Sequence, residues 1–213
     1  MRIILATWVK CVIREAAKSV KDRNPVRRQL IVGGTNCDAA PIATPRAALM
    51  QTKGMNYIIR PLTTEDESFL WEMLYQALHV PEGQIATPRE VIHLPELARY
   101  VQDWGHEDDC GFLASDAATD HPIGAVWLRL LMGGNKGYGF VDDNTPELSI
   151  AVLPEYRGQG IGTQLLAQLF SSECGVSPVS LSVSVGNSAV RLYERFSFSV
   201  ISESAGSLTM KRG

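Results

Sequence analysis

From residue 55 onward, the spacing of apolar and polar residues changes repeatedly between the periods of strands and helices. Short apolar and β-branched runs bounded by Gly, Pro, Asp or Ser predict strands. Apolar residues spaced at three and four predict helices, and Thr64 followed by Glu67 indicates a capping box before the first of them. The predicted strands are 57–62, 111–116, 122–131, 147–153, 179–185, 199–202 and 208–211, and the predicted helices are 69–78, 95–104, 158–170 and 188–196. Strands interleaved with helices predict a mixed α/β domain.

Residues 1–54 differ from the rest of the chain in charge. They contain ten Lys and Arg against three Asp and Glu, whereas residues 55–213 contain ten against twenty. Segment 6–23 has the spacing of a basic amphipathic helix, which suits a membrane surface, a nucleic acid or a transit peptide. Upstream translation, with Met55 as the working start, is the simpler explanation. We expect 1–54 to be a basic, poorly ordered extension whose last part, 35–54, is a linker, and 55–213 to be one domain.

The overall composition is that of an ordinary soluble globular protein, with 45% hydrophobic and 20% charged residues. No apolar run approaches the roughly 18 residues that span a bilayer. The cysteines at 11, 37, 110 and 174 form no Cys-x-x-Cys pair, so we expect neither a zinc site nor a disulfide framework. Unpaired cysteines indicate a cytoplasmic location. The histidines lack the spacing of metal ligands, so we expect no metal.

The segment 154–166, PEYRGQGIGTQLL, has glycines at 158, 160 and 162, directly before a predicted helix. The first turn of a helix has unpaired N–H groups and a partial positive charge, so it suits an anion. Glycines let a phosphate approach these groups without meeting a Cβ atom, and Arg157 adds a positive charge. The chain contains no Gly-Lys-Ser or Gly-Lys-Thr for a P-loop, and Thr163 stands where G-x-G-x-x-G needs its third glycine. The pattern therefore predicts a site for a phosphate-bearing ligand that is neither a P-loop nor a G-x-G-x-x-G dinucleotide-binding turn.

Two blocks of sequence resemble one family. Segment 147–166, ELSIAVLPEYRGQGIGTQLL, resembles the acetyl-CoA signature of the GNAT superfamily of N-acetyltransferases, with its R-x-x-G-x-G pattern in a strand–turn–helix unit. Segment 179–198, VSLSVSVGNSAVRLYERFSF, resembles the family's later strand and helix, N-x-A-V-x-L-Y-E-x-x-G-F. Ser197 stands where the family has glycine, so we expect the turn after this helix to differ. The resemblance covers 55–213 and implies a mostly antiparallel central sheet, flanked by helices and splayed between strands four and five.

In this fold acetyl-CoA lies in the gap between the splayed strands. The resemblance implies that the main chain of Ile150 holds the thioester carbonyl, that of Val152 holds the pantetheine arm, and the amides of 158–163 hold the pyrophosphate. Core packing is the alternative for the first two. A surface cation is the alternative for Arg157, and an N-cap is the alternative for Asn187. The full set of cofactor-binding residues so implied is Ile150, Val152, Arg157, Gly158, Gly160, Ile161, Gly162, Thr163 and Asn187.

For catalysis, the resemblance implies direct attack of a neutral amine on the thioester, with no metal and no enzyme nucleophile. Tyr193 matches the family's general acid, which protonates the leaving thiolate; the alternative is a core tyrosine. Glu147 stands where several members place a base that acts directly or through water. The alternative for Glu147 is an exposed carboxylate at a strand end, and some relatives use a chain of waters instead of one base.

The function implied is an acetyl-CoA-dependent N-acetyltransferase acting on a primary amine of a small molecule, peptide or protein. The alternative is a non-catalytic acyl-CoA-binding or regulatory module. We expect no nucleic-acid partner and no membrane span. The sequence does not identify the acceptor amine or the oligomeric state, and a homodimer is one possibility. Aromatic and acidic groups in the expected acceptor cleft suit a cationic amine. They are Trp71, Tyr75, Trp104, His106, Tyr138, Asp142 and Asp143.

Overall fold

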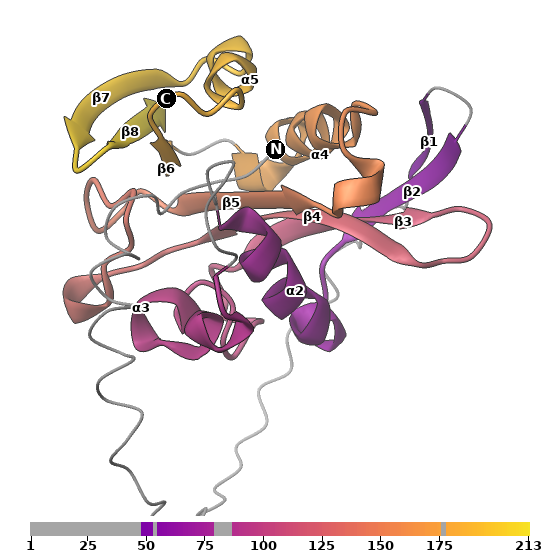
Figure 1. Ribbon diagram of the computed structural model, residues 1–213, viewed down its shortest axis with the longest axis horizontal. Coiled ribbons are helices and arrows are strands. Elements are labelled where there is room, and N and C mark those ends of the chain that lie inside the picture. The colour runs from indigo at the N-terminus through magenta and orange to yellow at the C-terminus, as the bar shows by residue number, and fades with distance from the viewer. Residues whose placement is uncertain (1–47, 53–54, 79–86, 176–177) are drawn as a thin grey trace, which may run out of the picture.

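The computed structural model describes residues 48–52, 55–78, 87–175 and 178–213. Their strands form one mixed sheet in the order β1-β2-β3-β4-β5-β6-β8-β7 (Figure 1). Neighbouring strands run antiparallel except β5 and β6, which run parallel. The strands are β1 (Ala48–Thr52), β2 (Met55–Pro61), β3 (Cys110–Asp116), β4 (Pro122–Arg129), β5 (Glu147–Val152), β6 (Val179–Ser184), β7 (Ser199–Ser204) and β8 (Ser207–Arg212).

Helices cover both faces of this sheet (Figure 1). Helices α2 (Glu67–Ala77) and α3 (Pro95–Ala98) lie on one face, with α2 against β4 and β5. Helix α4 (Ile161–Ser171) packs on β3, β4 and β5 from the other face, and α5 (Val190–Arg195) lies near β6, β7 and β8. None of the described helices has the length and apolar character needed to cross a bilayer. Short 3₁₀ helices occupy Thr64–Asp66, Arg89–His93, Gly133–Asn135, Pro154–Tyr156 and Glu173–Gly175.

The apolar periodicity that predicted the helices is the periodicity that the core uses. In α2 the buried residues are Leu70, Met73, Leu74 and Ala77, and in α4 they are Ile161, Leu165, Leu166 and Leu169. Every residue of β5 and of β6 is buried, because both strands lie inside the sheet with layers on either face. The mixed α/β fold with helices on both faces is confirmed. The strand β1 was not among the predicted strands, so every later strand number rises by one. The strands expected as four and five are therefore β5 and β6.

Three local predictions are wrong in detail. Strand β1 lies inside the expected linker and pairs with β2 from Ala48↔Ile59 to Thr52↔Met55, so the sheet begins before residue 55. The capping box uses Thr63 and Asp66, one position earlier than predicted. The helix predicted at 95–104 ends at Ala98. The rest of the expected extension, residues 1–47 and 53–54, lies outside the described residues.

The cysteine prediction is also wrong. Cys110, at the start of β3, forms a disulfide with Cys174, which follows α4, and their Cα atoms are 6.1 Å apart. The two residues are 64 positions apart in the sequence, so no local spacing motif announces the pair. The expectation of a cytoplasmic location, which rested on unpaired cysteines, loses that support. Cys11 and Cys37 lie outside the described residues.

Candidate active site

The glycine turn at residues 158–162 connects β5 to α4. Its three glycines are required for two different reasons, backbone conformation and free space. Gly158 has φ +74° and Gly160, the N-cap of α4, has φ +85°, a left-handed conformation that L side chains avoid. Gly162 lies within the first turn of α4, where any residue fits the backbone. Its lack of a side chain therefore needs another reason, and the space in front of the helix supplies one.

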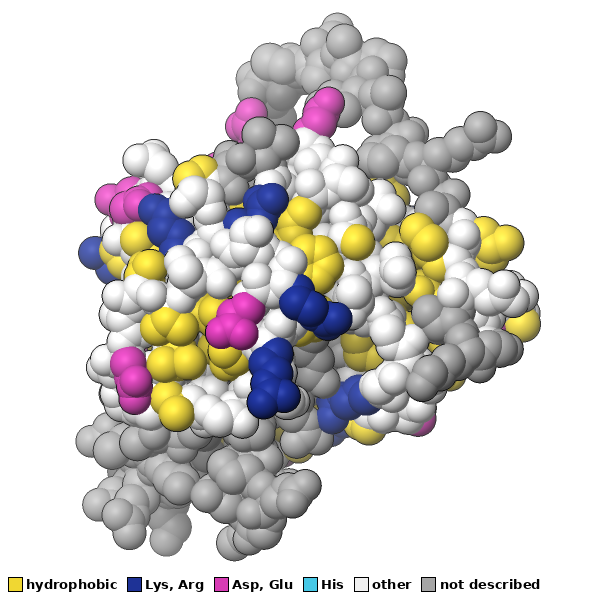
Figure 2. Space-filling view, turned by 90° about the horizontal axis from the view of Figure 1, so that it is seen from above, with side chains coloured by type: hydrophobic (Ala, Val, Ile, Leu, Met, Phe, Trp, Pro, Cys, Tyr) yellow, Lys and Arg dark blue, Asp and Glu magenta, His cyan; other side chains and the backbone are white. Residues whose placement is uncertain are grey.

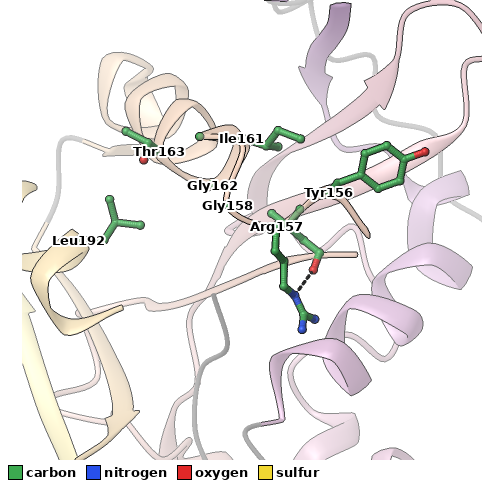
Figure 3. Close-up of a pocket in the computed structure, with 9 residues that line it drawn as sticks. Tyr156, Arg157, Gly158, Ile161, Gly162, Thr163 and Leu192 are labelled. Carbon is green, nitrogen blue, oxygen red and sulfur yellow. Dashed lines mark hydrogen bonds between the residues drawn. The ribbon is translucent and has the colours of Figure 1, made fainter. Parts of the chain in front are cut away.

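A pocket of about 290 Å³ lies in front of this helix end (Figure 3). Thr163 N–H and Gln164 N–H both donate to the carbonyl of Gly160, at 3.0 and 3.1 Å, so the N–H groups of Ile161 and Gly162 precede the first helical hydrogen bond. The N-terminus of α4, with these free N–H groups, suits an anion. Figure 2 shows the face that carries α4 and α5, where Lys and Arg side chains are spread across the middle. The pocket is lined by Val152, Tyr156, Arg157, Gly158, Gly160, Ile161, Gly162, Thr163 and Leu192.

Strands β5 and β6 separate beside this pocket. Their described pairing consists of Glu147↔Ser180, whereas β4 and β5 are paired at six positions from Gly124↔Val152 to Arg129↔Glu147. Ser180 N–H donates to Pro146 O on the β6 side, and Leu153 N–H donates to Ile123 O on the β4 side. Because strand residues alternate in direction, the main-chain groups of Ile150 and Val152 point toward β6, beyond the last paired position. The sheet therefore opens toward the pocket with main-chain polar groups on its inner edge.

Arg157 lines the pocket, but its guanidinium is directed elsewhere (Figure 3). Its Nε–H donates to the carbonyl of Val152 at 2.8 Å, and NH2 donates to Gln76 Oε1 on α2, also at 2.8 Å. This side chain therefore holds the end of β5 against α2.

Two residues of the second sequence block lie outside the pocket lining. Asn187 Oδ1 accepts the N–H of Ala189 at 2.9 Å, and its carbonyl accepts the N–H of Val190, so Asn187 stabilises the turn that opens α5. Tyr193 is fully buried on α5, and its hydroxyl has no hydrogen-bond partner among the described residues. Burial raises the pKa of this phenol above its usual value. Its ring packs edge-on against Phe198, with the ring centroids 5.9 Å apart. Native structures rarely leave a buried hydroxyl unpaired, so the unpaired hydroxyl needs an explanation.

Glu147 is a buried carboxyl, not the exposed one that was the alternative. It is 2% exposed at the end of β5 where β5 and β6 meet. Its Oε1 accepts the Tyr100 hydroxyl at 2.6 Å and the N–H of Gly139 at 2.7 Å, while Oε2 has no partner among the described residues. Burial raises the pKa of Glu147 to about 7, although Tyr100, Gly139 and Arg99 each oppose the rise. A carboxyl with a pKa near 7 is suited to exchange protons at neutral pH.

The expected acceptor residues are largely engaged with their own surroundings. Trp71 donates to Glu67 Oε1 and packs against His93, and Tyr75 donates to Thr87 O. Trp104 is buried beneath the guanidinium of Arg129, and Asp142 accepts from Thr145 and pairs with Lys211. His106 is exposed, and Asp143 accepts the N–H of Gly133. Tyr138 stacks on Tyr100, the hydrogen-bond partner of Glu147, with the two ring centroids 6.4 Å apart.

Sequence reasoning missed Tyr156 and Leu192 of the pocket, and Tyr100, Gly137 and Gly139 around Glu147. Leu192 stood in a matched motif, so its helix position could have placed it near the turn. Tyr100 lies 47 positions from Glu147 in a segment with no local signal. Within the described residues, no group of three His, Cys, Asp or Glu side chains is placed to hold a metal ion.

Comparisons with known proteins agree with this geometry. The sequence profile of the acetyltransferase (GNAT) family matches residues 71–198, more than half of the chain. The GNAT domain of PAT from S. lividans has the same fold, with 17% identity and a TM-score of 0.55 over 78% of this chain and 95% of that one. So has the PaiA N-acetyltransferase from Thermoplasma acidophilum, solved in complex with coenzyme A, with 23% identity and a TM-score of 0.51 over 74% and 99%.

A third solved structure is a GNAT-family acetyltransferase from Streptococcus pneumoniae. It is 18% identical, with a TM-score of 0.50 over 73% of this chain and 98% of that one. At such identities the likeness concerns the fold. No protein of curated function matches the sequence.

Proposed function

The chain belongs to the acetyltransferase (GNAT) family and is an acyltransferase, and on that premise we propose that it transfers an acetyl group from acetyl-CoA to a primary amine. Both substrates are bound together, and the amine attacks the acyl carbon directly. The observation that carries this proposal is the open β5–β6 gap ending at a glycine turn and the N-terminus of α4. A thioester arm fits the gap, and a pyrophosphate fits the turn.

The chain's own main chain would bind acetyl-CoA. The N–H groups of the turn that precede the first helical hydrogen bond, those of Ile161 and Gly162 among them, would hold the pyrophosphate. The absent Cβ of Gly162 would allow close approach. The main chain of Ile150 would hold the thioester carbonyl, and that of Val152 would hold the pantetheine arm. Arg157 donates to the carbonyl of Val152, so we give it a supporting role. When bound, acetyl-CoA supplies an acyl thioester that a neutral amine attacks.

Two side chains would manage the protons. Glu147 accepts the proton of the attacking amine at Oε2, its unpartnered oxygen. Because Glu147 is closed off from solvent, the proton reaches it through a water molecule or after displacement of the loop over it. Tyr193 keeps its proton at neutral pH, since burial raises its pKa, and donates it to the departing sulfur.

The first test is a thermal-shift titration of the full chain with acetyl-CoA. A ligand at one hundred times its Kd adds about 2.7 kcal/mol of stability, which gives a clear shift. Gly162→Glu places a carboxylate where we put the pyrophosphate and should abolish the shift. Gln168→Glu makes a charge change two turns further along α4, outside the pocket, and should retain it. No shift with the native protein contradicts the proposed ligand.

A second test separates the enzyme from a non-catalytic acyl-CoA-binding module. Release of CoA is followed with a panel of primary amines, for the native protein and for Tyr193→Phe. Turnover that falls at least tenfold in the variant, with unchanged affinity for acetyl-CoA, supports the acid role. Binding without turnover for every amine favours the module.

A further inference from the structure

The hydroxyl of Tyr100 is fixed in direction by two hydrogen bonds. It donates to Glu147 Oε1 at 2.6 Å and accepts the N–H of Tyr138 at 2.7 Å. A phenol has one proton to donate. Because the main-chain N–H of Tyr138 can only donate, the proton of Tyr100 is committed to the carboxyl of Glu147.

These contacts make the two oxygens of Glu147 unequal. Oε1 receives both Tyr100 and the N–H of Gly139, whereas buried Oε2 receives no donor from the described residues. Rotation of the carboxyl to exchange the oxygens would break both bonds at once. Oε2 is therefore the oxygen that stays available to accept a proton.

Tyr100 is itself held in place from β4. Trp127 Nε1–H donates to the carbonyl of Tyr100 at 3.0 Å. The buried guanidinium of Arg129 donates to the carbonyls of Arg99 and Gln102 on either side, at 3.1 and 2.7 Å, and pairs with Asp109. Segment 99–102 is thus fixed to the sheet at three carbonyls, so the tyrosine ring has little freedom to leave Glu147.

The loop before β5 closes against the same pair. A Cβ atom at Gly137 would collide with Glu147 Oε2 and would lie 2.6 Å from the Tyr100 hydroxyl. A Cβ at Gly139 would lie 3.0 Å from Glu147 Cδ and 2.8 Å from Ser182 N on β6. Only glycine main chain fits over the carboxyl, and it leaves the Oε2 side narrow. In so narrow a space, the carboxyl of Glu147 can accept a proton only if Oε2 faces the proton donor.

We propose that Tyr100 is a positioning residue that orients the carboxyl of Glu147 so that Oε2 receives the proton of the acceptor amine. The inference rests on the proposed function, because it gives Glu147 the role of base. Tyr100 acts through Glu147 and need not touch either substrate.

The test is the pH dependence of kcat/KM for Tyr100→Phe. The Tyr100 hydrogen bond lowers the pKa of Glu147, and so does the charge of Arg99; Tyr138, Gly139 and Ser180 add no charge at neutral pH. Loss of the hydroxyl should therefore move the acidic limb of the profile to higher pH and lower kcat at neutral pH at least tenfold. The KM for acetyl-CoA should stay within a factor of two.

Tyr57→Phe is the matched control. It removes the hydroxyl of another fully buried tyrosine, on β2, which β3 and β4 separate from β5 in the sheet. Its profile should equal that of the native protein. If Tyr100→Phe does not fold, a fluorinated tyrosine at position 100 keeps the contact and donates more strongly, so the acidic limb should move to lower pH.

Glu147→Gln separates the two hypotheses. If it keeps full activity, Glu147 is not the base and that part of the proposed function fails. If it loses activity while Tyr100→Phe has the native kcat and the native acidic limb, the positioning role of Tyr100 is refuted and the base role stands. An unmoved limb with fluorinated tyrosine refutes it equally.

Discussion

The guanidinium of Arg157 lies 2.8 Å from the side-chain oxygen of Gln76, 81 positions earlier in the chain, and joins the glycine turn to helix α2. Sequence analysis left a phosphate contact and a surface cation as the two alternatives for this arginine. The observed bonds assign it to the architecture around the pocket, because both Val152 and Gln76 receive its protons.

Arg157→Ala and Gln76→Ala should both destabilise the protein. A hydrogen bond to a charged group contributes about 1.5–3 kcal/mol, so urea denaturation should show losses of that order, larger for Arg157→Ala. Acetyl-CoA affinity, measured by calorimetry, should stay within threefold in both variants. A tenfold loss of affinity confined to Arg157→Ala would show that the guanidinium reaches the phosphate after all.

Glu147 should make the protein less stable as pH rises toward neutrality. Burial raises its pKa to about 7 in the folded chain, whereas the unfolded chain keeps a value near 4.5. Between these values the folded state holds a proton that the unfolded state has lost, so the free energy of unfolding falls as pH rises, by about 1.4 kcal/mol per unit. The contribution is complete below pH 4.5 and is lost as pH passes 7.

Glu147→Gln should flatten this slope between pH 5 and 7. The carboxyls with lowered pKa, among them Asp66 and Asp109, act in the opposite sense and at lower pH, so they leave this window clear. Chemical denaturation at intervals of half a pH unit measures the slope. Equal slopes for the variant and the native protein would mean that Glu147 ionises normally.

The Cys110–Cys174 disulfide should respond to reduction. A bond that closes a loop of 64 residues stabilises a chain by about 4 kcal/mol in the chain-entropy account, with 2–4 kcal/mol typical of measurements. A reductant should therefore lower the thermal midpoint of the native protein. The double variant Cys110→Ser, Cys174→Ser should melt at the reduced value and should not respond to reductant. A native protein indifferent to reductant would contradict the pairing.

Replacement of Ser197 by glycine should make the folded protein more stable. The turn after α5 gives Ser197 a φ of +65°, a left-handed conformation, at the position where the sequence departs from the family's glycine. Relief of that strain should raise the free energy of unfolding by up to about 1 kcal/mol in Ser197→Gly. Ser197→Ala, which keeps the Cβ atom, should bring no gain. Differential scanning calorimetry of the three proteins decides the matter, and a less stable glycine variant would refute it.

Most of the fold could be predicted because its signals are local. The glycine turn, the helix behind it and the buried faces of α2 and α4 follow from residues a few positions apart. The seven pocket-lining residues that sequence analysis proposed lie within a stretch of twelve positions, 152–163. A local pattern is sufficient for such a site.

The remainder depends on contacts between distant residues. The helix predicted at 95–104 stops early, and Arg129 takes the carbonyl of Arg99, which a continuing helix would bond to the N–H of residue 103. Arg129 also binds the carbonyls of Gln102 and Asp103. Tyr100 and Glu147, and likewise Cys110 and Cys174, meet only after the sheet has formed. No spacing rule within one segment contains such information.

The separation of β5 from β6 has a mechanical consequence. Among the described strands, β6 is joined to β8 at six positions, but to β5 only at Glu147↔Ser180. A rotation of β6, β7 and β8 about that single pairing disrupts fewer interstrand hydrogen bonds than any other division at the centre of the sheet. Segment 178–213, which carries Tyr193, is thus joined to β5 at a single strand pairing, and the carboxyl at that pairing is Glu147.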